Sequence, residues 1–376
     1  MPEIDPLDFT TQLLACNSVT PADGGTQAVL ADALTSIGFE VHRFHHGEAP
    51  DGPIANLFAT RGNGGRHFAF AGHTDVVPPG EGWESDAFTP TVRGELLYGR
   101  GAVDMKGAIG AFVAAASRGQ PDDGTLSLII TGDEEGPATY GTKALMAWMA
   151  EKDIRPDMIL VGEPTSSARL GDTIKIGRRG SVNMWIEVPG VQGHVAYPHL
   201  ASNPIPALAS VLTALSAMPL DPGTDWFQPS NLEITEIAAD NPAANVIPGH
   251  ARARLNIRFN DTYRGGDLIE QVREIVAGHA PEATLTARIS GEAFLTAPGP
   301  LSTLVADAIS DATGLAPELS TSGGTSDARF LSTIAPTVEF GLLNATMHKL
   351  DEAVAIPDLH MLADIYATII RRALAN

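Results

Sequence analysis

The chain has 376 residues, with 45 Asp and Glu against 24 Lys and Arg, so its formal net charge is −21. This excess of negative charge argues against nucleic acids and anionic membranes as partners. The single cysteine, Cys16, excludes a disulfide framework and a thiolate-rich metal site, so a bound metal needs His and carboxylate ligands. The acidic N-terminus has no apolar leader segment, and we therefore expect a soluble cytoplasmic protein.

Helical and strand patterns alternate over roughly the first 180 residues, as judged from apolar spacing. In chain order, we predict a helix over 29–37, strands over 54–59 and 68–71, a helix over 106–117, a strand over 126–131, a helix over 140–150 and a strand over 158–161. Strands separated by helices are typical of an α/β fold with a mostly parallel sheet covered on both faces.

The middle of the chain has a different pattern. Apolar and polar residues alternate over 252–259, which is typical of an antiparallel sheet with one buried face. We also predict strands over 182–188 and 283–289 and helices over 204–217 and 265–278, followed by a return of the α/β pattern and a final helix over 357–374. The sequence thus predicts a first domain of residues 1–179 and 293–376, interrupted by an α+β domain of residues 180–292.

Histidines and carboxylates follow several of the predicted strands. His73 and Asp75 come after the strand 68–71, the run 133–135 follows the strand 126–131, and Glu163 follows the strand 158–161. Asp104 precedes a predicted helix, and His348 follows the apolar segment 338–343. In open α/β sheets, ligand sites form at the carboxyl ends of the strands. Each residue alone is more simply a turn former or a solvated charge.

The combination of these residues favours a metal site. Adjacent carboxylates repel one another unless a cation offsets their charge. Two histidines with three or more carboxylates suit zinc or a similar divalent ion, and they exceed the ligands of one tetrahedral site. They suit two metals with a bridging carboxylate. Since side chains two apart on an extended segment share a side, we expect the Asp75 carboxylate to accept a hydrogen bond from His73. Of Glu134 and Glu135, one can be a ligand and the other a general base.

Four sequence blocks, 72–78, 98–107, 132–135 and 161–164, resemble the signature blocks of the di-zinc aminoacylase/carboxypeptidase (acetylornithine deacetylase-like) metallohydrolases. The resemblance implies a zinc-aminopeptidase-like catalytic domain. It also implies an inserted domain of two helices on a four-stranded antiparallel sheet, which forms a homodimer and acts as a lid. It further implies two Zn²⁺ per subunit, one on His73 and Glu163, the other on Glu135 and His348, with Asp104 bridging, Asp75 orienting His73 and Glu134 as general acid/base.

Further motifs at 177–181, 192–199, 245–248, 323–329 and 339–349 resemble members of this family that remove a succinyl group from a diamino acid. By this resemblance, His194 stabilises the oxyanion in the partner's active site; on its own it is more simply a structural histidine. A succinyl carboxylate needs cations and hydrogen-bond donors, and the candidates are Lys175, Arg178, Ser181, Tyr197, Asn245, Arg258, Gly324 and Thr325. One departure weakens this assignment: Ala244 stands where such enzymes often carry an asparagine before Asn245.

Two enzymatic alternatives use the same scaffold, an acetylornithine deacetylase-like hydrolase and a glutamyl carboxypeptidase-like hydrolase. An acetyl group has no distal carboxylate, so a clamp at Arg178 would have no partner in the first. The alternative outside the enzymes is an inactive, metal-stabilised binding protein, which would not need Glu134 as a general base. Zinc, cobalt and manganese all accept this ligand set, so the residue types do not select among them.

Overall fold

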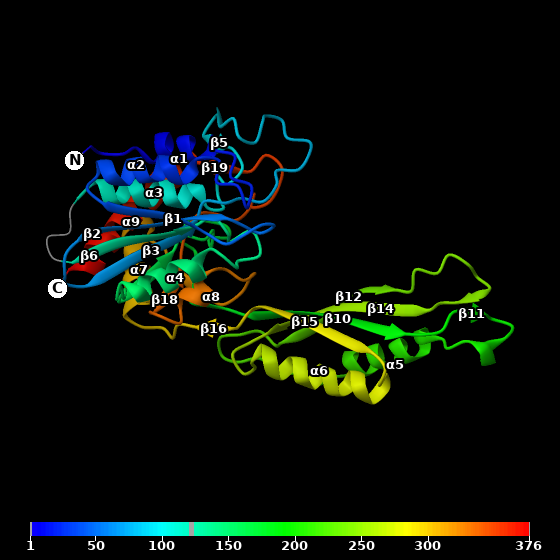
Figure 1. Ribbon diagram of the computed structural model, residues 1–376. Helices are drawn as coiled ribbons and strands as arrows, with labels where there is room; N and C mark the ends of the chain where they lie inside the picture. The colour runs from blue at the N-terminus through cyan, green and yellow to red at the C-terminus, as the bar shows by residue number, and fades with distance from the viewer. Residues whose placement is uncertain (1, 120–123, 376) are drawn as a thin grey trace. The chain divides into compact units, whose positions relative to one another are not determined.

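The computed structural model describes residues 2–119 and 124–375, which fold into two compact units (Figure 1). The first unit comprises the described parts of 1–176, 296–320 and 326–376, and the second comprises Gly177–Leu295 and Thr321–Thr325. The domain limits at 179/180 and 292/293 stay a prediction. No helix within the described residues has the length and apolarity needed to cross a lipid bilayer.

A central mixed sheet organises the first unit. Within the described residues it has eight strands, in the order β1 (Glu40–His46), β2 (Ile54–Gly62), β6 (Thr125–Thr131), β3 (His67–His73), β7 (Met158–Val161), β18 (Thr337–Glu339), β8 (Thr173–Lys175) and β17 (Glu318–Ser320). The central neighbours β6, β3, β7 and β18 run parallel, whereas β1, β2 and β6 pair antiparallel. The predicted mostly parallel sheet is thus confirmed, with antiparallel pairing at the β1–β2–β6 edge and between β18 and β8.

Helices cover both faces of this sheet, because consecutive residues of β3 and β6 point to opposite faces and nearly all of them are buried. The first unit contains α1 (Pro6–Leu14), α2 (Thr26–Ser36), α3 (Lys106–Ser117), α4 (Thr142–Glu151), α7 (Pro300–Thr313), α8 (Ala328–Leu331) and α9 (Ile356–Leu374). Helix α3, rich in alanine and glycine, is buried along its whole length and packs against α1 and α9. At Gly110 a side chain would collide with Thr10, so the small residue permits the close approach of α1.

A small antiparallel sheet also belongs to the first unit. It orders β19 (Ala353–Ala355), β5 (Leu96–Tyr98) and β4 (Thr91–Arg93). Strand β5 leads into the loop that ends at Asp104, and β19 follows the turn that carries His348. This sheet therefore joins two segments that are about 250 residues apart in sequence.

The second unit is the predicted pair of helices on a four-stranded antiparallel sheet. Its described strands lie in the order β12 (Asn231–Ala238), β14 (His250–Phe259), β10 (Gly180–Pro189) and β15 (Thr284–Gly291). Helices α5 (Pro204–Ser216) and α6 (Gly265–His279) pack on the face that buries the apolar side chains of β14, such as Leu255 and Ile257. The remaining short elements are β9 (Gly177–Arg178) with β16 (Phe294–Leu295), β11 (Gly193–His194) with β13 (Val246–Ile247), and η1 (Pro198–Leu200).

Candidate active site

The fold brings the candidate metal ligands together in the first unit. His73 is the last residue of β3, Glu135 lies in the loop after β6, and Glu163 lies two residues after β7. Asp104 ends the loop before α3, and His348 lies in the turn before β19. Because β3, β6 and β7 are parallel neighbours, their carboxyl ends meet at one edge of the sheet.

The possible ligand atoms of the described residues form three groups, two of which share Asp104, namely His73–Asp104–Glu163 and Asp104–Glu135–His348; the third is His73–Glu134–Glu135. His73 Nε2 lies 3.1 Å from Asp104 Oδ1 and 3.9 Å from Glu163 Oε1. His348 Nε2 lies 3.1 Å from Asp104 Oδ2 and 2.8 Å from Glu135 Oε1. Ligands at tetrahedral zinc distances are about 3.3 Å apart. Each oxygen of Asp104 thus faces a different histidine, as a bridging carboxylate requires.

The hydrogen bonds of His73 set the tautomer that suits a metal. Its Nδ1–H donates to the backbone carbonyl of Asp75 at 2.9 Å, which leaves the lone pair of Nε2 directed toward Asp104. A lone pair that faces a carboxylate oxygen needs a proton or a cation between them. The donor set therefore fits a divalent cation at this position.

The pKa values of the charged groups also indicate that positive charge is favoured at this site. Burial would lower the pKa of His73, but the hydrogen bond and charge of Asp104 outweigh it and raise that pKa well above its usual value. Hydrogen bonds to Asp104 and Glu135 raise the pKa of His348 to about 10. Burial would raise the pKa of Asp104, but hydrogen bonds from both histidines hold it well below its usual range. Positive charge, from protons or from metal ions, is what these carboxylates favour.

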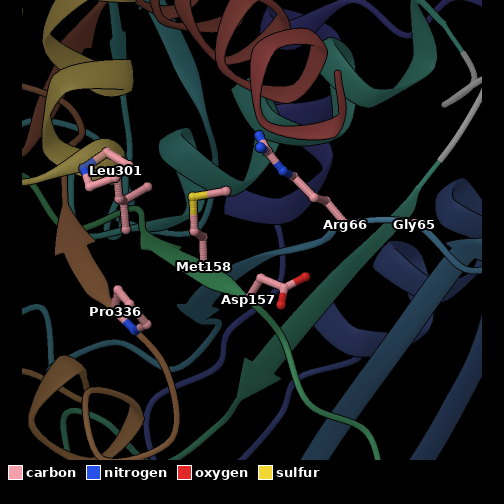
Figure 2. Close-up of a pocket in the computed structure, with 7 residues that line it drawn as sticks. Gly65, Arg66, Asp157, Met158, Leu301 and Pro336 are labelled. Carbon is pink, nitrogen blue, oxygen red and sulfur yellow. The ribbon is translucent and has the colours of Figure 1, made fainter. Parts of the chain in front are cut away.

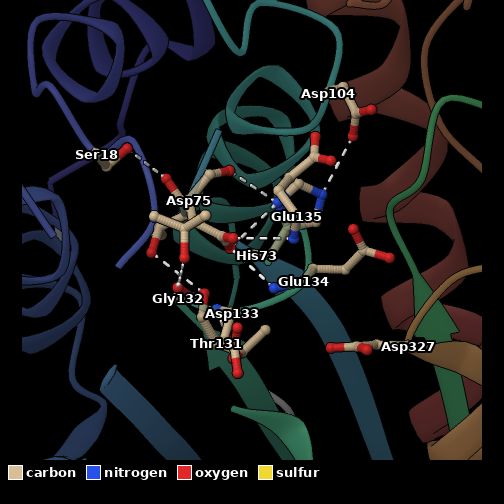
Figure 3. Close-up of polar contacts among 12 residues, drawn as sticks. Ser18, His73, Asp75, Asp104, Thr131, Gly132, Asp133, Glu134, Glu135 and Asp327 are labelled. Atoms are coloured by element: carbon tan, nitrogen blue, oxygen red, sulfur yellow. Dashed lines mark hydrogen bonds and ion pairs between the residues drawn. The ribbon is translucent and has the colours of Figure 1, made fainter. Parts of the chain in front are cut away.

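Glu134 lies beside the ligand groups as a carboxyl group with an altered acidity. Burial and then the charge of Glu163 raise its pKa well above the usual value for glutamate. Burial similarly raises the pKa of Asp75 to about 7. Figure 3 shows Glu134, in the loop after β6, between His73 and Asp327 and close to the candidate ligands. A carboxyl group with a raised pKa is suited to accept and return a proton.

The expected contact between the Asp75 carboxylate and the His73 ring is wrong in detail. The carboxylate Oδ1 is 3.6 Å from His73 Nδ1, and the backbone carbonyl of Asp75 accepts the ring proton instead. The carboxylate accepts the backbone N–H groups of Glu134 (3.2 Å) and Glu135 (2.9 Å), as the dashed lines of Figure 3 show. Asp75 therefore positions the loop that carries a ligand and the candidate base, and it orients His73 through its main chain.

Asp133 and Asp327 have roles that the sequence did not indicate. The Asp133 carboxylate accepts the backbone N–H groups of Ala138, Thr139 and Tyr140, so it turns away from the ligands and caps its own loop. Asp327 is buried, accepts a hydrogen bond from the Thr142 hydroxyl at 2.6 Å, and lines a cavity of about 10 Å³ with His73, Glu134 and Glu163. Asp327 lies in the block 323–329, but its type and spacing carry no signal of this placement.

One group of candidate substrate residues lies near the start of β10. Arg178 Nη1 donates to the carbonyl of Gly324 at 3.1 Å, next to Thr325. Ser181 accepts a hydrogen bond from the Asn256 side chain and is paired in register with Arg258. Burial, and then the charge of Arg179, lower the pKa of Arg258. In the first unit, Lys175 at the end of β8 is buried and donates to the Ser320 hydroxyl at 3.2 Å.

A second group, His194, Tyr197 and Asn245, lies at the other end of β10. Val195 N–H donates to the Asn245 carbonyl at 3.1 Å, and the rings of His194 and Tyr197 are 5.7 Å apart. Gly190 N–H donates to the Gly249 carbonyl, which places these loops beyond the end of β10 at Pro189. Eight residues of strand separate Ser181 from Pro189, which is on the order of 25 Å. The second unit therefore does not bring its candidate residues together in one place.

A mostly parallel α/β sheet has, at its carboxyl edge, two groups of possible metal ligands that share Asp104 and a buried carboxyl group with a raised pKa, an arrangement that suits a metal-dependent hydrolase. The chain belongs to the peptidase family M20/M25/M40, whose model matches residues 69–372.

Proteins of this family are similar to the chain over nearly its whole length. It is 70% identical over 373 residues to a succinyl-diaminopimelate desuccinylase of Rhizorhabdus wittichii, covering 99% of each chain, and 63% identical over 370 residues to one of Sphingopyxis alaskensis, covering 98% of each. Among solved structures, an aminopeptidase PepT of Bacillus cereus aligns over 100% of both chains with a TM-score of 0.81 at 19% identity, which shows a shared fold.

Proposed function

We propose that the chain hydrolyses N-succinyl-LL-2,6-diaminopimelate to succinate and LL-2,6-diaminopimelate, a step of lysine biosynthesis. The observation that carries this proposal is the 70% identity, over 99% of both chains, to a relative named succinyl-diaminopimelate desuccinylase. That identity and the family match make the chain an enzyme, so the inactive binding protein is set aside. We place this biosynthetic activity in the cytoplasm.

Two Zn²⁺ ions per subunit are the proposed cofactors, with Co²⁺ or Mn²⁺ as substitutes. His73 and Glu163 would hold one ion, Glu135 and His348 the other, and Asp104 both, as the two ligand groups allow. Bound there, the ions polarise the amide carbonyl and lower the pKa of the attacking water.

Glu134 is the proposed general acid/base. It accepts a proton from the attacking water as the new C–O bond forms, and it returns that proton to the nitrogen as the amide C–N bond breaks. The second proton of the water follows by the same route, so the products are a carboxylate and an ammonium group, and atoms and charge balance. Burial and the charge of Glu163 bring the pKa of Glu134 closer to those of its proton-transfer partners, which favours both steps.

The arginines at the start of β10 support a substrate with a distal carboxylate. Among the described residues, Arg258 has no hydrogen bond or ion pair, and it lies near the second cation Arg179. Two half-buried cations favour an anion between them or beside them. A succinyl group supplies that anion and an acetyl group does not, so we assign Arg178 and Arg258 of the second unit to the carboxylate, with Ser181, Gly324 and Thr325 as polar contacts. Lys175 of the first unit stays a candidate cation.

The separation of the two candidate groups along β10 supports a homodimer. One substrate cannot reach residues on the order of 25 Å apart. We therefore assign His194, Tyr197 and Asn245 of the second unit to the substrate bound by the partner subunit. The His194 Nδ1 accepts the N–H of Ala196 at 3.0 Å, so its Nε2–H is the donor left to stabilise an oxyanion.

The substrate assignment is tested by kcat/KM for N-succinyl-LL-diaminopimelate, N-acetylornithine and a glutamyl peptide, with metal content measured on the same samples before and after chelation. We expect at least about a hundredfold preference for the succinyl substrate, because an unpaired buried cation is strongly unfavourable. Arg258→Ala should remove most of that preference. Comparable turnover of the acetyl substrate by the wild-type protein would contradict the assignment.

The dimer assignment is tested by mixing two inactive variants. His194→Ala and Glu134→Gln protomers should form hybrid dimers in which one site holds an intact Glu134 and receives an intact His194. A partial return of activity on mixing, in proportion to hybrid dimers, is the expected result. If hybrids form, as shown by mass spectrometry, but stay inactive, His194 does not act across the interface.

A further inference from the structure

Glu352 is a fully buried carboxylate that accepts four N–H groups. It lies four residues after His348 and directly before β19. Its Oε2 accepts Arg100 Nη1–H at 2.7 Å and Gly101 N–H at 3.0 Å. Its Oε1 accepts Val103 N–H at 2.9 Å and the N–H of Asp104 itself at 3.2 Å. The carboxylate is thus bonded along the whole loop that ends at the shared metal ligand.

The loop of residues 99–104 depends on this anchor. Gly99 N–H also donates to the Glu352 backbone carbonyl at 3.0 Å. Gly101 has φ +90°, and a side chain there would lie 2.9 Å from Val76, so only glycine fits the turn. Four of the six backbone N–H groups of residues 99–104 are thus directed at Glu352.

The turn that carries His348 ends at Glu352. Thr346 donates its hydroxyl proton to the Ala353 carbonyl at 2.9 Å and accepts the Ala353 N–H at 3.2 Å, which closes the turn around residues 347–352. His348 has φ +59°, a conformation that residues with a side chain rarely adopt. The turn therefore relies on its closure to keep this backbone conformation.

Arg100 provides the counter-charge that allows Glu352 to be buried. It is only 2% exposed, it also donates to the Pro79 carbonyl at 3.2 Å, and its guanidinium lies 5.2 Å from the ring centre of Trp83. A buried carboxylate with a paired arginine and three backbone donors is held in one orientation.

We infer that Glu352 is a positioning residue that fixes Asp104 relative to His348 and so sets the metal affinity of the Asp104–Glu135–His348 group. The inference rests on the two-metal site of the proposed function. Asp104 belongs to both groups, but only this group also takes His348 from the turn next to Glu352, whereas His73 and Glu163 lie at the ends of β3 and β7; the effect on the other group is therefore smaller. Loss of Glu352 should therefore weaken the two metal sites unequally.

The test is a titration of the metal-free full-length protein with Co²⁺, followed by calorimetry and by the visible absorption of bound cobalt. The variants are Glu352→Gln, which places an amide NH₂ against the donors of Arg100 and Gly101, and Glu352→Asp, which keeps the charge but shortens the side chain by one methylene. The matched control is Gln27→Ala, because Gln27 is also fully buried but bonds to the Ala55 carbonyl, on another part of the sheet.

We expect two binding steps in the wild-type protein, and in Glu352→Gln one step weakened about 10- to 100-fold with the other changed less than about threefold. Glu352→Asp should give an intermediate loss, and excess Co²⁺ should restore activity to both. Gln27→Ala should lower the melting temperature but keep both steps. Equal weakening of both steps, or a lower melting temperature with both affinities intact, would overturn the inference. If Glu352→Gln does not fold, the same criteria apply to Glu352→Asp. Failure of the wild-type protein itself to bind two metals would instead contradict the proposed function.

Discussion

The polar side chains at the two ends of the central strands in the first unit differ in whether they need positive charge nearby. At the carboxyl ends, His73, Asp104 and Glu163 face one another with a cavity of only about 10 Å³ beside them. At the amino ends of β3, β7 and β18 lies a cavity of about 450 Å³, with the mostly apolar lining shown in Figure 2. The larger of these two cavities thus lies at the amino ends, away from the candidate metal ligands.

The polar groups at the amino end already satisfy one another. His67 N–H donates to Asp157 Oδ2 at 2.8 Å, and His67 Nε2 is 2.8 Å from the Ser127 hydroxyl. At the carboxyl end, by contrast, carboxylates and histidine lone pairs converge, and only positive charge satisfies them. The comparison indicates that converging carboxylates and histidines, rather than cavity size, mark the candidate site.

The strongest test of this contrast removes one carboxylate from each end. Glu134→Gln should lower kcat about 10²- to 10⁴-fold, because no other group at the site would carry the proton, while both metals stay bound. Asp157→Asn, at the amino end, should change kcat less than about twofold. Steady-state kinetics and metal analysis on both variants measure this. Near-normal turnover by Glu134→Gln would contradict the proposed difference between the carboxyl and amino ends of the strands.

A smaller effect on kcat is expected when Asp75, which holds the loop after β6, is replaced. In Asp75→Asn the amide NH₂ faces one of the two backbone N–H groups that the carboxylate accepts, and an unsatisfied buried N–H costs about 1–3 kcal/mol. We expect kcat to fall about 10- to 100-fold as Glu134 and Glu135 shift, with a smaller change in KM. Unchanged kcat would show that the loop keeps its position without Asp75.

The sequence could place the candidate ligands because each of them follows a strand or precedes a helix whose pattern is clear, and the folded chain brings them close together. Helix α3 even has the predicted limits of Lys106–Ser117. That these residues bind metal stays a prediction. It did not predict β1, an edge strand with little burial and no apolar alternation. It placed the Asp75 carboxylate on His73 by the two-residue period of a strand, but β3 ends at His73, so that period no longer applies.

Glu352 and Asp327 could not have been found from local patterns. Glu352 bonds to a loop about 250 residues earlier in the chain, and Asp327 to Thr142, 185 residues away. Neither distance leaves a periodicity or a motif spacing around the residue. Only the folded chain reveals such positioning contacts, whereas ligands at strand ends can be inferred from the pattern that defines the strand.

The smallest expected effect concerns His67, a half-buried titratable group at the amino end, away from the candidate ligands. Burial, opposed by the nearby Asp157 and by a hydrogen bond from the ring to the Arg155 backbone carbonyl, lowers the pKa of His67 below 6.5. The neutral ring is favoured in the folded state. As the pH falls through 6.5 the unfolded chain therefore takes up the proton first, and stability is lost until the pH reaches the folded pKa.

His67→Gln removes this titration, so the stability advantage of the wild-type protein over the variant should be smaller at pH 5 than at pH 7.5. Urea unfolding of both proteins at the two pH values measures the difference, and the carboxylates of the metal site cancel because both proteins share them. The matched control is His45→Gln, which replaces an exposed histidine of β1 by the same residue. If the stability difference between the wild-type protein and His67→Gln is the same at both pH values, the amino end does not disfavour a charged histidine. The amino end would then no longer differ in this respect from the carboxyl end, where the pKa values of His73 and His348 are raised.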